Sequence, residues 1–177
     1  MSMSPRMLAL QVAVLVSAAC LVQVHGYGSG APPDACGDMI PQHHTDPQNS
    51  PSPYQIRSAK TKTPGQVIVT ITGPEPFKGF MAQCRVGNTP VGKFINPPSN
   101  VKLVDCGGGK GVRVSPKTIA LHQSQTAATH NDKSEKKEII LTWKAPPNLK
   151  EQVTCAATVA KNGGVFWVNQ KSNTLTL

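Results

Sequence analysis

From residue 66 onward, apolar and mixed side chains alternate with a period of two in short runs. The alternation occupies residues 67–72, 80–85, 139–144 and 153–160. Successive side chains of a strand point to opposite faces of a sheet, so this period predicts strands with one apolar face each. Gly and Pro clusters separate the runs, and Asn162-Gly163 predicts a hairpin. No long amphipathic helical pattern competes, and the chain is therefore expected to form an antiparallel β-sandwich.

The first 26 residues have the pattern of a secretory signal peptide. Arg6 is the only charged residue among the first 33, and the apolar run Met7–Val22 follows it. Compact residues at Val24 and Gly26 fit a cleavage site, so residues 1–26 are expected to be removed and residues 27–177 to form one secreted domain. No apolar run reaches the roughly 20 residues of a transmembrane helix.

The cysteines agree with an oxidising compartment. Of the five, Cys20 lies in the predicted leader, which leaves Cys36, Cys84, Cys106 and Cys155. An even number in a short secreted chain predicts two disulfides, for which three connectivities exist. Because Cys84 and Cys155 share the apolar faces of their strands, we expect them to pair in the core. Cys36 and Cys106 would then staple the N-terminal segment to the domain.

Three segments have a weaker pattern. Residues 27–65 are rich in Pro, Ser, Gln and His and are expected to form an extended, loop-like lead-in. The charged run 132–138 contains equal numbers of acids and bases and is expected to be a solvated loop. Residues 164–169 and 174–177 are expected to form a last pair of strands.

The basic residues are distributed unevenly along the chain. The formal net charge is +9, and three stretches between consecutive acidic residues carry only bases. A secreted protein with a positive face would attract lipopolysaccharide, teichoic acid or anionic phospholipid. An even spread of charge for solubility is the alternative, and strand order decides between the two. The candidate residues for binding an anionic surface are Arg57, Lys60, Lys62, Lys110, Arg113 and Lys117.

Other motifs indicate little chemistry. Gly107–Gly111 lacks the spacing of a phosphate-binding loop and is expected to be a flexible turn. His43, His44, His122 and His130 are weighed as metal ligands, but exposed loop histidines are mostly solvated, and we expect no metal or cofactor. No nucleophile has a catalytic signature, so we expect no enzyme activity. Trp143 and Trp167 are expected to pack in the core rather than to stack on nucleic acid bases.

An ordered set of motifs resembles the reeler (reelin N-terminal) domain. The motifs are Ala35–Met39, Phe77–Arg85, Val104–Cys106, Leu141–Pro147 and Val165–Val168. The resemblance covers residues 27–177 and is strongest to single-domain insect haemolymph defence proteins of the noduler type. It implies an immunoglobulin-like all-β sandwich. It also implies a role in innate immunity through recognition of microbes, haemocyte aggregation and direct antibacterial action.

On this resemblance, the expected partners are bacterial or fungal surface polymers (lipopolysaccharide, lipoteichoic acid, glucan) and the haemocyte surface, in the haemolymph. Relatives of the ferric-chelate-reductase type carry the same domain beside haem-bearing membrane helices, which this sequence lacks. The alternative function is an extracellular matrix or cell-adhesion module with no microbial ligand.

Overall fold

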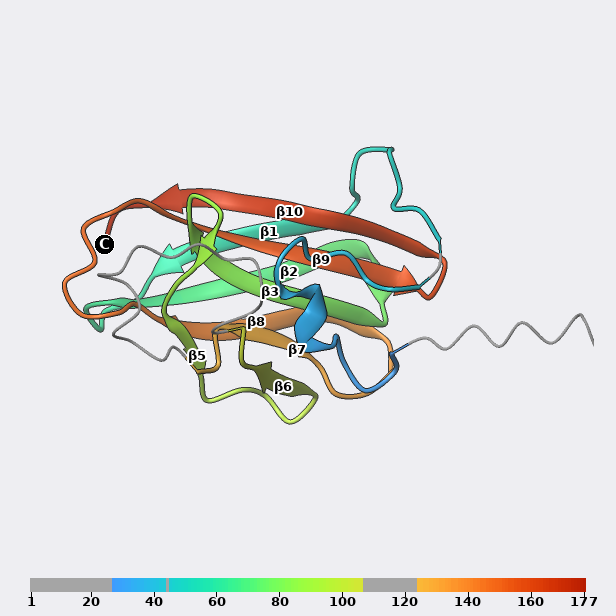
Figure 1. Ribbon diagram of the computed structural model, residues 1–177, viewed down its shortest axis with the longest axis horizontal. Coiled ribbons are helices and arrows are strands. Elements are labelled where there is room, and N and C mark those ends of the chain that lie inside the picture. The colour runs from blue at the N-terminus through green and yellow to red at the C-terminus, as the bar shows by residue number, and fades with distance from the viewer. Residues whose placement is uncertain (1–26, 44, 107–123) are drawn as a thin grey trace, which may run out of the picture.

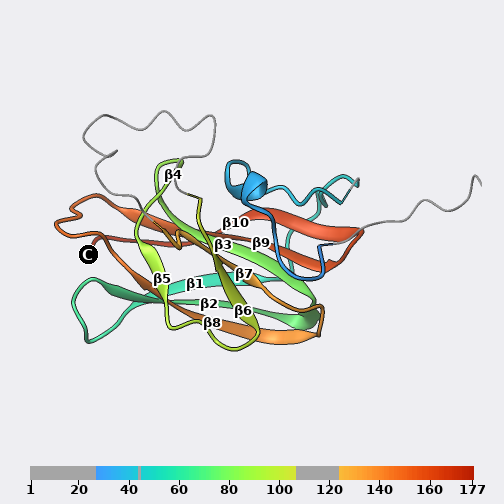
Figure 2. The ribbon, with the colours of Figure 1, turned by 60° about the horizontal axis from the view of Figure 1, so that its bottom comes forward.

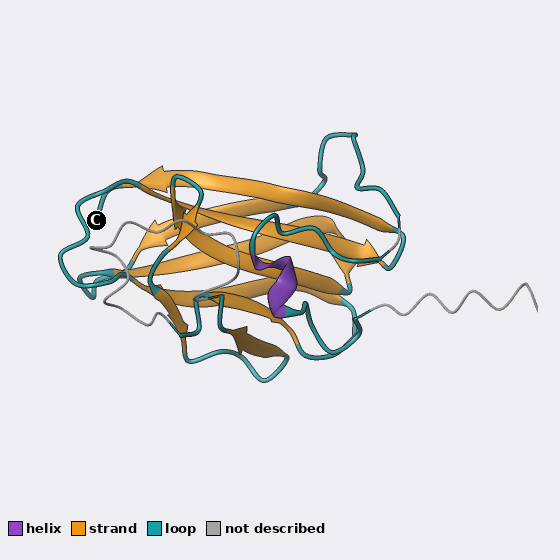
Figure 3. Cartoon of the chain, viewed as in Figure 1, coloured by secondary structure: helices purple, strands orange, loops and turns teal. Residues whose placement is uncertain are grey.

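The computed structural model describes residues 27–43, 45–106 and 124–177, which form two antiparallel sheets packed face to face (Figures 1 and 3). The elements are one 3-10 helix and ten strands in this described part: η1 Pro33–Cys36, β1 Gln55–Lys60, β2 Gln66–Phe77, β3 Gly79–Val86, β4 Thr89–Pro90, β5 Lys93–Ile95, β6 Val101–Val104, β7 Ala127–His130, β8 Lys136–Lys144, β9 Val153–Asn162 and β10 Val165–Leu175. The all-β sandwich expected from the alternation is confirmed.

The two sheets have different sizes. Sheet A has the order β1-β2-β8-β5, and sheet B has the order β10-β9-β3-β7-β6, with β4 paired to β3 at the side. Every described strand pair is antiparallel. The hairpin predicted at Asn162-Gly163 is present between β9 and β10, but its turn residues are Gly163 and Gly164, because Asn162 still belongs to β9 and pairs with Val165.

The apolar set of each alternating run faces the partner sheet. Val69, Ile71 and Trp143 of sheet A are completely buried, and so are Ala82 and Val159 of sheet B. The Trp143 indole N–H donates to the carbonyl of Val91 at 2.9 Å, so the largest core side chain has its polar atom satisfied. The core therefore lies between the sheets, where the period-two pattern places it.

The two disulfides have different positions in this architecture. Cys84 on β3 lies directly opposite Cys155 on β9, so this disulfide joins neighbouring strands of sheet B on the core face. Cys36 in η1 is joined to Cys106 after β6 and fastens the N-terminal segment to sheet B. These are the pairs expected from the strand faces, although the core disulfide does not bridge the two sheets.

The lead-in is more structured than its composition suggests. Residues 55–60 form β1, the edge strand of sheet A, rather than part of a loop. Ile56 and Ser58 face inward there, and so short an alternation is easily missed beside Pro and Ser residues. The segment before it, residues 27–43, crosses the outer face of sheet B and includes η1 (Figure 2).

Two further expectations are corrected. The last strand pair is a single strand, β10, which is paired with β9 through three register irregularities. The run 132–138 is not wholly a solvated loop, because β8 already begins at Lys136 and that lysine is only 4% exposed. In residues 27–43, 45–106 and 124–177, no helix is long and apolar enough to cross a bilayer.

Candidate functional site

Three of the six predicted anion-binding residues lie in the part of the chain that the structure describes. Arg57 and Lys60 lie on β1 and Lys62 follows in the turn to β2, and all three side chains are exposed. The other three, Lys110, Arg113 and Lys117, lie outside the described residues, as does the turn Gly107–Gly111. Of the other bases in the acid-free stretches, Arg85 is buried, so it contributes nothing to a positive surface.

Two lysines that the sequence analysis did not select face each other on sheet A. Lys93 of β5 and Lys144 of β8 are register partners, and both are exposed. Their neighbours in the strands, Phe94 and Trp143, are buried partners, which places both lysines on the outer face. Like charges directly opposite each other destabilise a sheet, so this pair has a cost that an anionic ligand would relieve.

The paired lysines line a shallow depression at one end of sheet A, which we call the lysine hollow. It has a volume of about 570 Å³, and its other lining residues include Gly65 of the β1–β2 turn and Pro146 after β8. The amide of Ala145 donates to the Gly65 carbonyl at 2.8 Å, which holds the turn against the end of β8. Of the predicted residues, Lys62 belongs to this turn, but it is not among the residues that line the hollow. No acidic residue is among the described residues that line it.

A second depression, the N-terminal cleft, lies between the N-terminal segment and the outer face of sheet B. Its volume is about 300 Å³. Buried Ala35 and Met39 line it from the N-terminal segment, and buried Met81 and Ala160 line it from sheet B. Its lining is mainly apolar, with Lys78 and Lys133 as the cationic residues.

Polar contacts fix the N-terminal segment over sheet B. The buried Arg85 guanidinium donates to the carbonyls of Cys36 and Gly37 at 3.0 and 3.1 Å, and Gln83 donates to the Cys36 carbonyl at 3.1 Å. The Thr158 hydroxyl donates to the carbonyl of Met39 at 2.6 Å. Burial lowers the pKa of Arg85, partly offset by the charge of Asp38. Gln83, Arg85 and Thr158 on the outer face of sheet B are therefore buried, and they hydrogen-bond to the backbone of the N-terminal segment.

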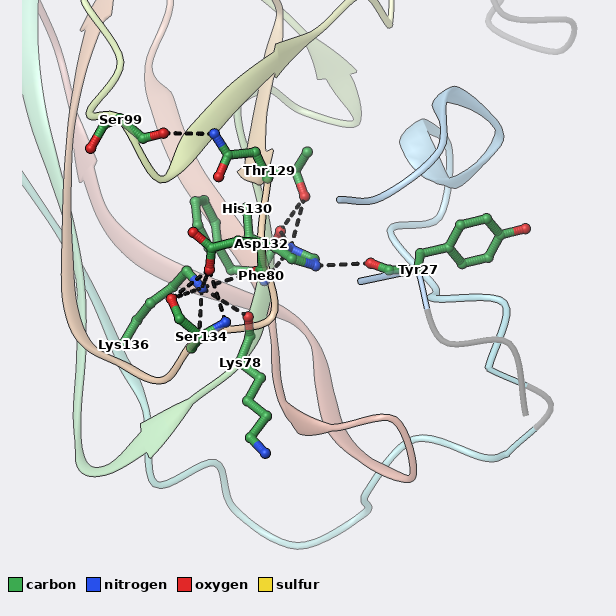
Figure 4. Close-up of polar contacts among 10 residues, drawn as sticks. Tyr27, Lys78, Phe80, Ser99, Thr129, His130, Asp132, Ser134 and Lys136 are labelled. Carbon is green, nitrogen blue, oxygen red and sulfur yellow. Dashed lines mark hydrogen bonds and ion pairs between the residues drawn. The ribbon is translucent and has the colours of Figure 1, made fainter. Parts of the chain in front are cut away.

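Two of the four histidines considered as metal ligands line the cleft. His43 and His130 both line it, whereas His44 and His122 lie outside the described residues. The Phe80 amide donates to Nδ1 of His130 at 3.2 Å, and Nε2 lies 3.0 Å from the Tyr27 carbonyl (Figure 4). Burial lowers the pKa of both His43 and His130, and the charge of His130 lowers the pKa of His43 further. At His130, the contacts with the Phe80 and Tyr27 backbone partly offset the effect of burial on the pKa, and the neighbouring lysine charges add to it. In the described residues no group of three His, Cys, Asp or Glu side chains is placed to hold a metal ion.

A buried lysine organises the loop beside the cleft. Lys136 Nζ donates to the carbonyls of Ser134 and Lys78 at 2.7 and 3.2 Å, and to the Asp132 carboxylate at 3.0 Å (Figure 4). Hydrogen bonds from Ser134 and from Lys136 lower the pKa of Asp132 to about 2. The loop that carries Lys133 and the backbone of Lys78 are thus tied to one buried ammonium group.

Sequence reasoning missed Arg85, Lys136 and the cleft for one reason. A period of two identifies the face that meets the other sheet, but it contains no information about what covers the opposite face. The available signal was the expected disulfide from Cys36 to Cys106, which requires the lead-in to lie near the end of β6.

Comparison with known proteins gives consistent matches. The family description "Reeler domain" matches residues 34–177. The Putative defense protein Hdd11 of Hyphantria cunea is 35% identical over 173 residues, covering 94% of this chain and 96% of that protein. Ferric-chelate reductase 1 of Bos taurus is 35% identical over 151 residues, covering 82% of this chain but 23% of the reductase. A crystal structure of the human F-spondin reeler domain has a TM-score of 0.54 at 15% identity, covering 80% of this chain and 98% of that domain, which shows a shared fold.

Proposed function

The chain belongs to the reeler domain family, and we propose that it is a secreted defence protein that binds anionic polymers on microbial surfaces. The observation that carries the proposal is the match to an insect putative defence protein over 94% of this chain and 96% of that relative. The match to ferric-chelate reductase 1 covers 23% of that protein, so its reductase activity is not transferred to this chain.

Two structural features support an extracellular role. Both disulfides tie strands or segments that are about 70 residues apart in the sequence, with separations of 70 and 71 residues. Such bonds persist in oxidising compartments, which agrees with the predicted signal peptide and with a protein of the haemolymph.

The lysine hollow is the part of the surface that best fits an anionic polymer. Lys93 and Lys144 are exposed and opposite each other, and the β1–β2 turn with Lys62 lies beside them. Exposed charges act on a polymer at long range and with strong salt dependence. Lipopolysaccharide and lipoteichoic acid carry repeated phosphate groups that can meet several lysines at once, so avidity would add to each weak contact. Linking microbes to one another or to haemocytes would then follow from binding.

The first experiment is a pull-down of the oxidised secreted protein on whole bacteria, purified lipopolysaccharide, glucan and haemocytes, at low and at physiological salt. We expect binding to bacteria and to lipopolysaccharide that weakens as salt is raised. Binding to haemocytes or matrix with none to any microbial material would replace the proposal with an adhesion function.

A charge-reversal variant tests whether the lysine hollow is the surface that binds lipopolysaccharide. Lys93→Glu with Lys144→Glu should reduce binding to lipopolysaccharide at least about tenfold, since attraction becomes repulsion. Lys137→Glu with Lys171→Glu is the matched control, because it makes the same change in net charge at two exposed lysines that do not line the hollow. Equal loss in both variants would mean that net charge, rather than the hollow, determines binding.

A further inference from the structure

The N-terminal cleft has the properties of a site for a small apolar ligand. At about 300 Å³ it lies at the lower end of the volumes that ligand pockets have in proteins. Ala35, Met39, Met81 and Ala160 supply buried apolar walls from both sides. Because the walls come from the N-terminal segment and from sheet B, the cleft exists only when the segment is in place.

Both methionines outside the predicted leader lie at this cleft. Three of the five lie in the predicted leader, and the remaining two, Met39 and Met81, both line it. An unbranched thioether adapts its shape to different apolar partners, and methionine is abundant at binding surfaces that accept variable apolar groups. The side chains around the cleft therefore suit a flexible chain better than a rigid ring system.

The polar groups of the cleft offer few contacts to a polar ligand. The Thr158 hydroxyl donates to the Met39 carbonyl, and both ring nitrogens of His130 have backbone partners. Nδ1 of His43 is buried and has no hydrogen-bond partner in the described part of the structure. A ligand in the cleft would thus be held mainly by burial of apolar surface.

Charge at the cleft has one sign. Lys78 and Lys133 line it with exposed side chains, and no acidic residue is among its described lining residues. Lys133 lies against Gly28, since a Cβ built on that glycine would be 3.7 Å from the Lys133 Cβ. The neighbouring Asp132 carboxylate is already paired with Lys136 at 3.0 Å. An anionic group at the rim would therefore meet two available ammonium groups.

We infer that the N-terminal cleft binds a single-chain anionic amphiphile, a medium-chain fatty acid, with its acyl chain between Met39 and Met81 and its carboxylate at Lys78 and Lys133. The volume has room for about ten groups of the size of a water molecule, at roughly 30 Å³ each, which suits one acyl chain and not two side by side. An uncharged apolar ligand would make no ion pair with Lys78 or Lys133, and a small anion would bury none of the apolar surface of the cleft. The inference is independent of microbial recognition.

The probe is dodecanoate, titrated below its micellar concentration into the oxidised secreted protein and followed by calorimetry and by the methyl NMR signals of methionine. We expect one site per chain and shifts of both methyl signals, which report only the cleft once the leader is removed. Acetate, which has the head group without the chain, should not bind. Dodecyltrimethylammonium, which has the chain with the opposite charge, should bind at least about tenfold more weakly.

Two variants test the walls and the rim separately. Ala160→Leu fills part of the cleft with a larger side chain and should weaken dodecanoate binding about tenfold or more. Lys78→Gln with Lys133→Gln should weaken it about fivefold. Lys137→Gln with Lys171→Gln is the matched control for the rim variant, because it removes two charges from exposed lysines that are not among the lining residues. The rim variant changes only surface side chains, so it keeps the test valid if the leucine variant folds poorly.

The outcomes separate this inference from the proposed function. Absence of dodecanoate binding by the unmodified protein, unchanged binding in both variants, or equal binding of the cationic detergent would each overturn the inference. None of these results would change the pull-down on bacteria, and failure of the pull-down would leave the dodecanoate measurements unaffected.

Discussion

The two outer faces of the sandwich have similar sequences and opposite environments. On β3 of sheet B the outward residues are Met81, Gln83 and Arg85, and all three are buried. On β8 of sheet A the outward residues include Ile140 and Lys144, and both are exposed. A mixture of polar and apolar residues on the outer face of a strand therefore does not show whether another segment covers that face. The difference arises because residues 27–43 cross sheet B, whereas no described segment crosses sheet A (Figure 2).

The covered face is held by a combination of one covalent bond and backbone hydrogen bonds. The disulfide from Cys36 to Cys106 brings the segment to the sheet. Arg85, Gln83 and Thr158 then donate to its carbonyl groups. Residues 27–43 are rich in Gly and Pro and have few large apolar side chains to bury, so the segment depends on such donors from the sheet.

The largest effect is expected from the two disulfides, which close loops of nearly equal length but serve different regions. The chain-entropy model assigns each about 4 kcal/mol for separations of 70 and 71 residues. Cys84→Ala with Cys155→Ala should lower the free energy of unfolding by more than that, since it also removes two buried sulfur atoms from the core. Guanidinium unfolding monitored by tryptophan fluorescence measures the difference.

Loss of the other disulfide should act locally. Cys36→Ala with Cys106→Ala should release the N-terminal segment before the sandwich unfolds. Hydrogen exchange would show this at the amides of Ala31 and Met39, whose acceptors are the Thr129 hydroxyl and the Ala35 carbonyl. Unchanged protection at these two amides would contradict the role assigned to the disulfide. The variant should also lose dodecanoate binding, because the cleft needs both walls.

Truncation of one apolar side chain on each outer face gives the next largest contrast. Met81 is 3% exposed and Ile140 is 49% exposed. Met81→Ala should lower the free energy of unfolding by about 2–4 kcal/mol, and Ile140→Ala by about 0.5 kcal/mol or less. The measurement is chemical denaturation of both variants under the same conditions. Equal effects would show that the N-terminal segment does not pack on sheet B in solution.

Removal of a positive charge from each face should produce a smaller contrast. Arg85→Ala leaves the buried carbonyls of Cys36 and Gly37 without this donor and should cost about 2 kcal/mol. Lys144→Ala, on the uncovered face, should change the free energy of unfolding by about 0.5 kcal/mol or less. Arg85→Lys distinguishes charge from geometry, since a lysine keeps the charge but not the planar donors. Near-complete rescue by lysine would contradict the need for those donors.

The smallest effect is expected from pH. Burial lowers the pKa of His43 and His130 below the ordinary value of about 6.5, so the unfolded chain binds more protons than the folded chain below that pH. The free energy of unfolding should therefore decrease as pH falls from 7 to 5. His130→Gln should reduce this slope, and melting temperatures across the range measure it.

Asp132, near His130, affects the free energy of unfolding in a lower pH range. The Asp132 carboxyl has a pKa lowered to about 2, so its contribution to stability is present above about pH 4 and is lost as pH falls toward 2. A slope between pH 7 and 5 that is the same with and without His130 would contradict the assignment to buried histidine.

Sequence patterns predicted the inner half of the molecule well. The alternation correctly predicted that Trp143, Val69 and Val159 are buried in the core. It also predicted the pairing of Cys84 with Cys155, because both lie on the apolar faces of their strands. The candidate site was predicted less well. Arg57, Lys60 and Lys62 are exposed, but the pairing of Lys93 with Lys144 depends on strand order, which links residues 51 positions apart. No local pattern contains such a pairing.

Three properties of this protein could be predicted from sequence patterns: which side chains face the core, which cysteines can pair and which family the chain resembles. These properties depend on local periodicity and on motif order, and both can be read along the chain. The burial of Arg85 and Lys136 depends on the folded chain as a whole. So do the pairing of Lys93 with Lys144 and the cleft that Met39 and Met81 line. Each of these depends on a segment that returns to cover or flank a distant strand, and the position of a covering segment is determined by long-range contacts rather than by local sequence.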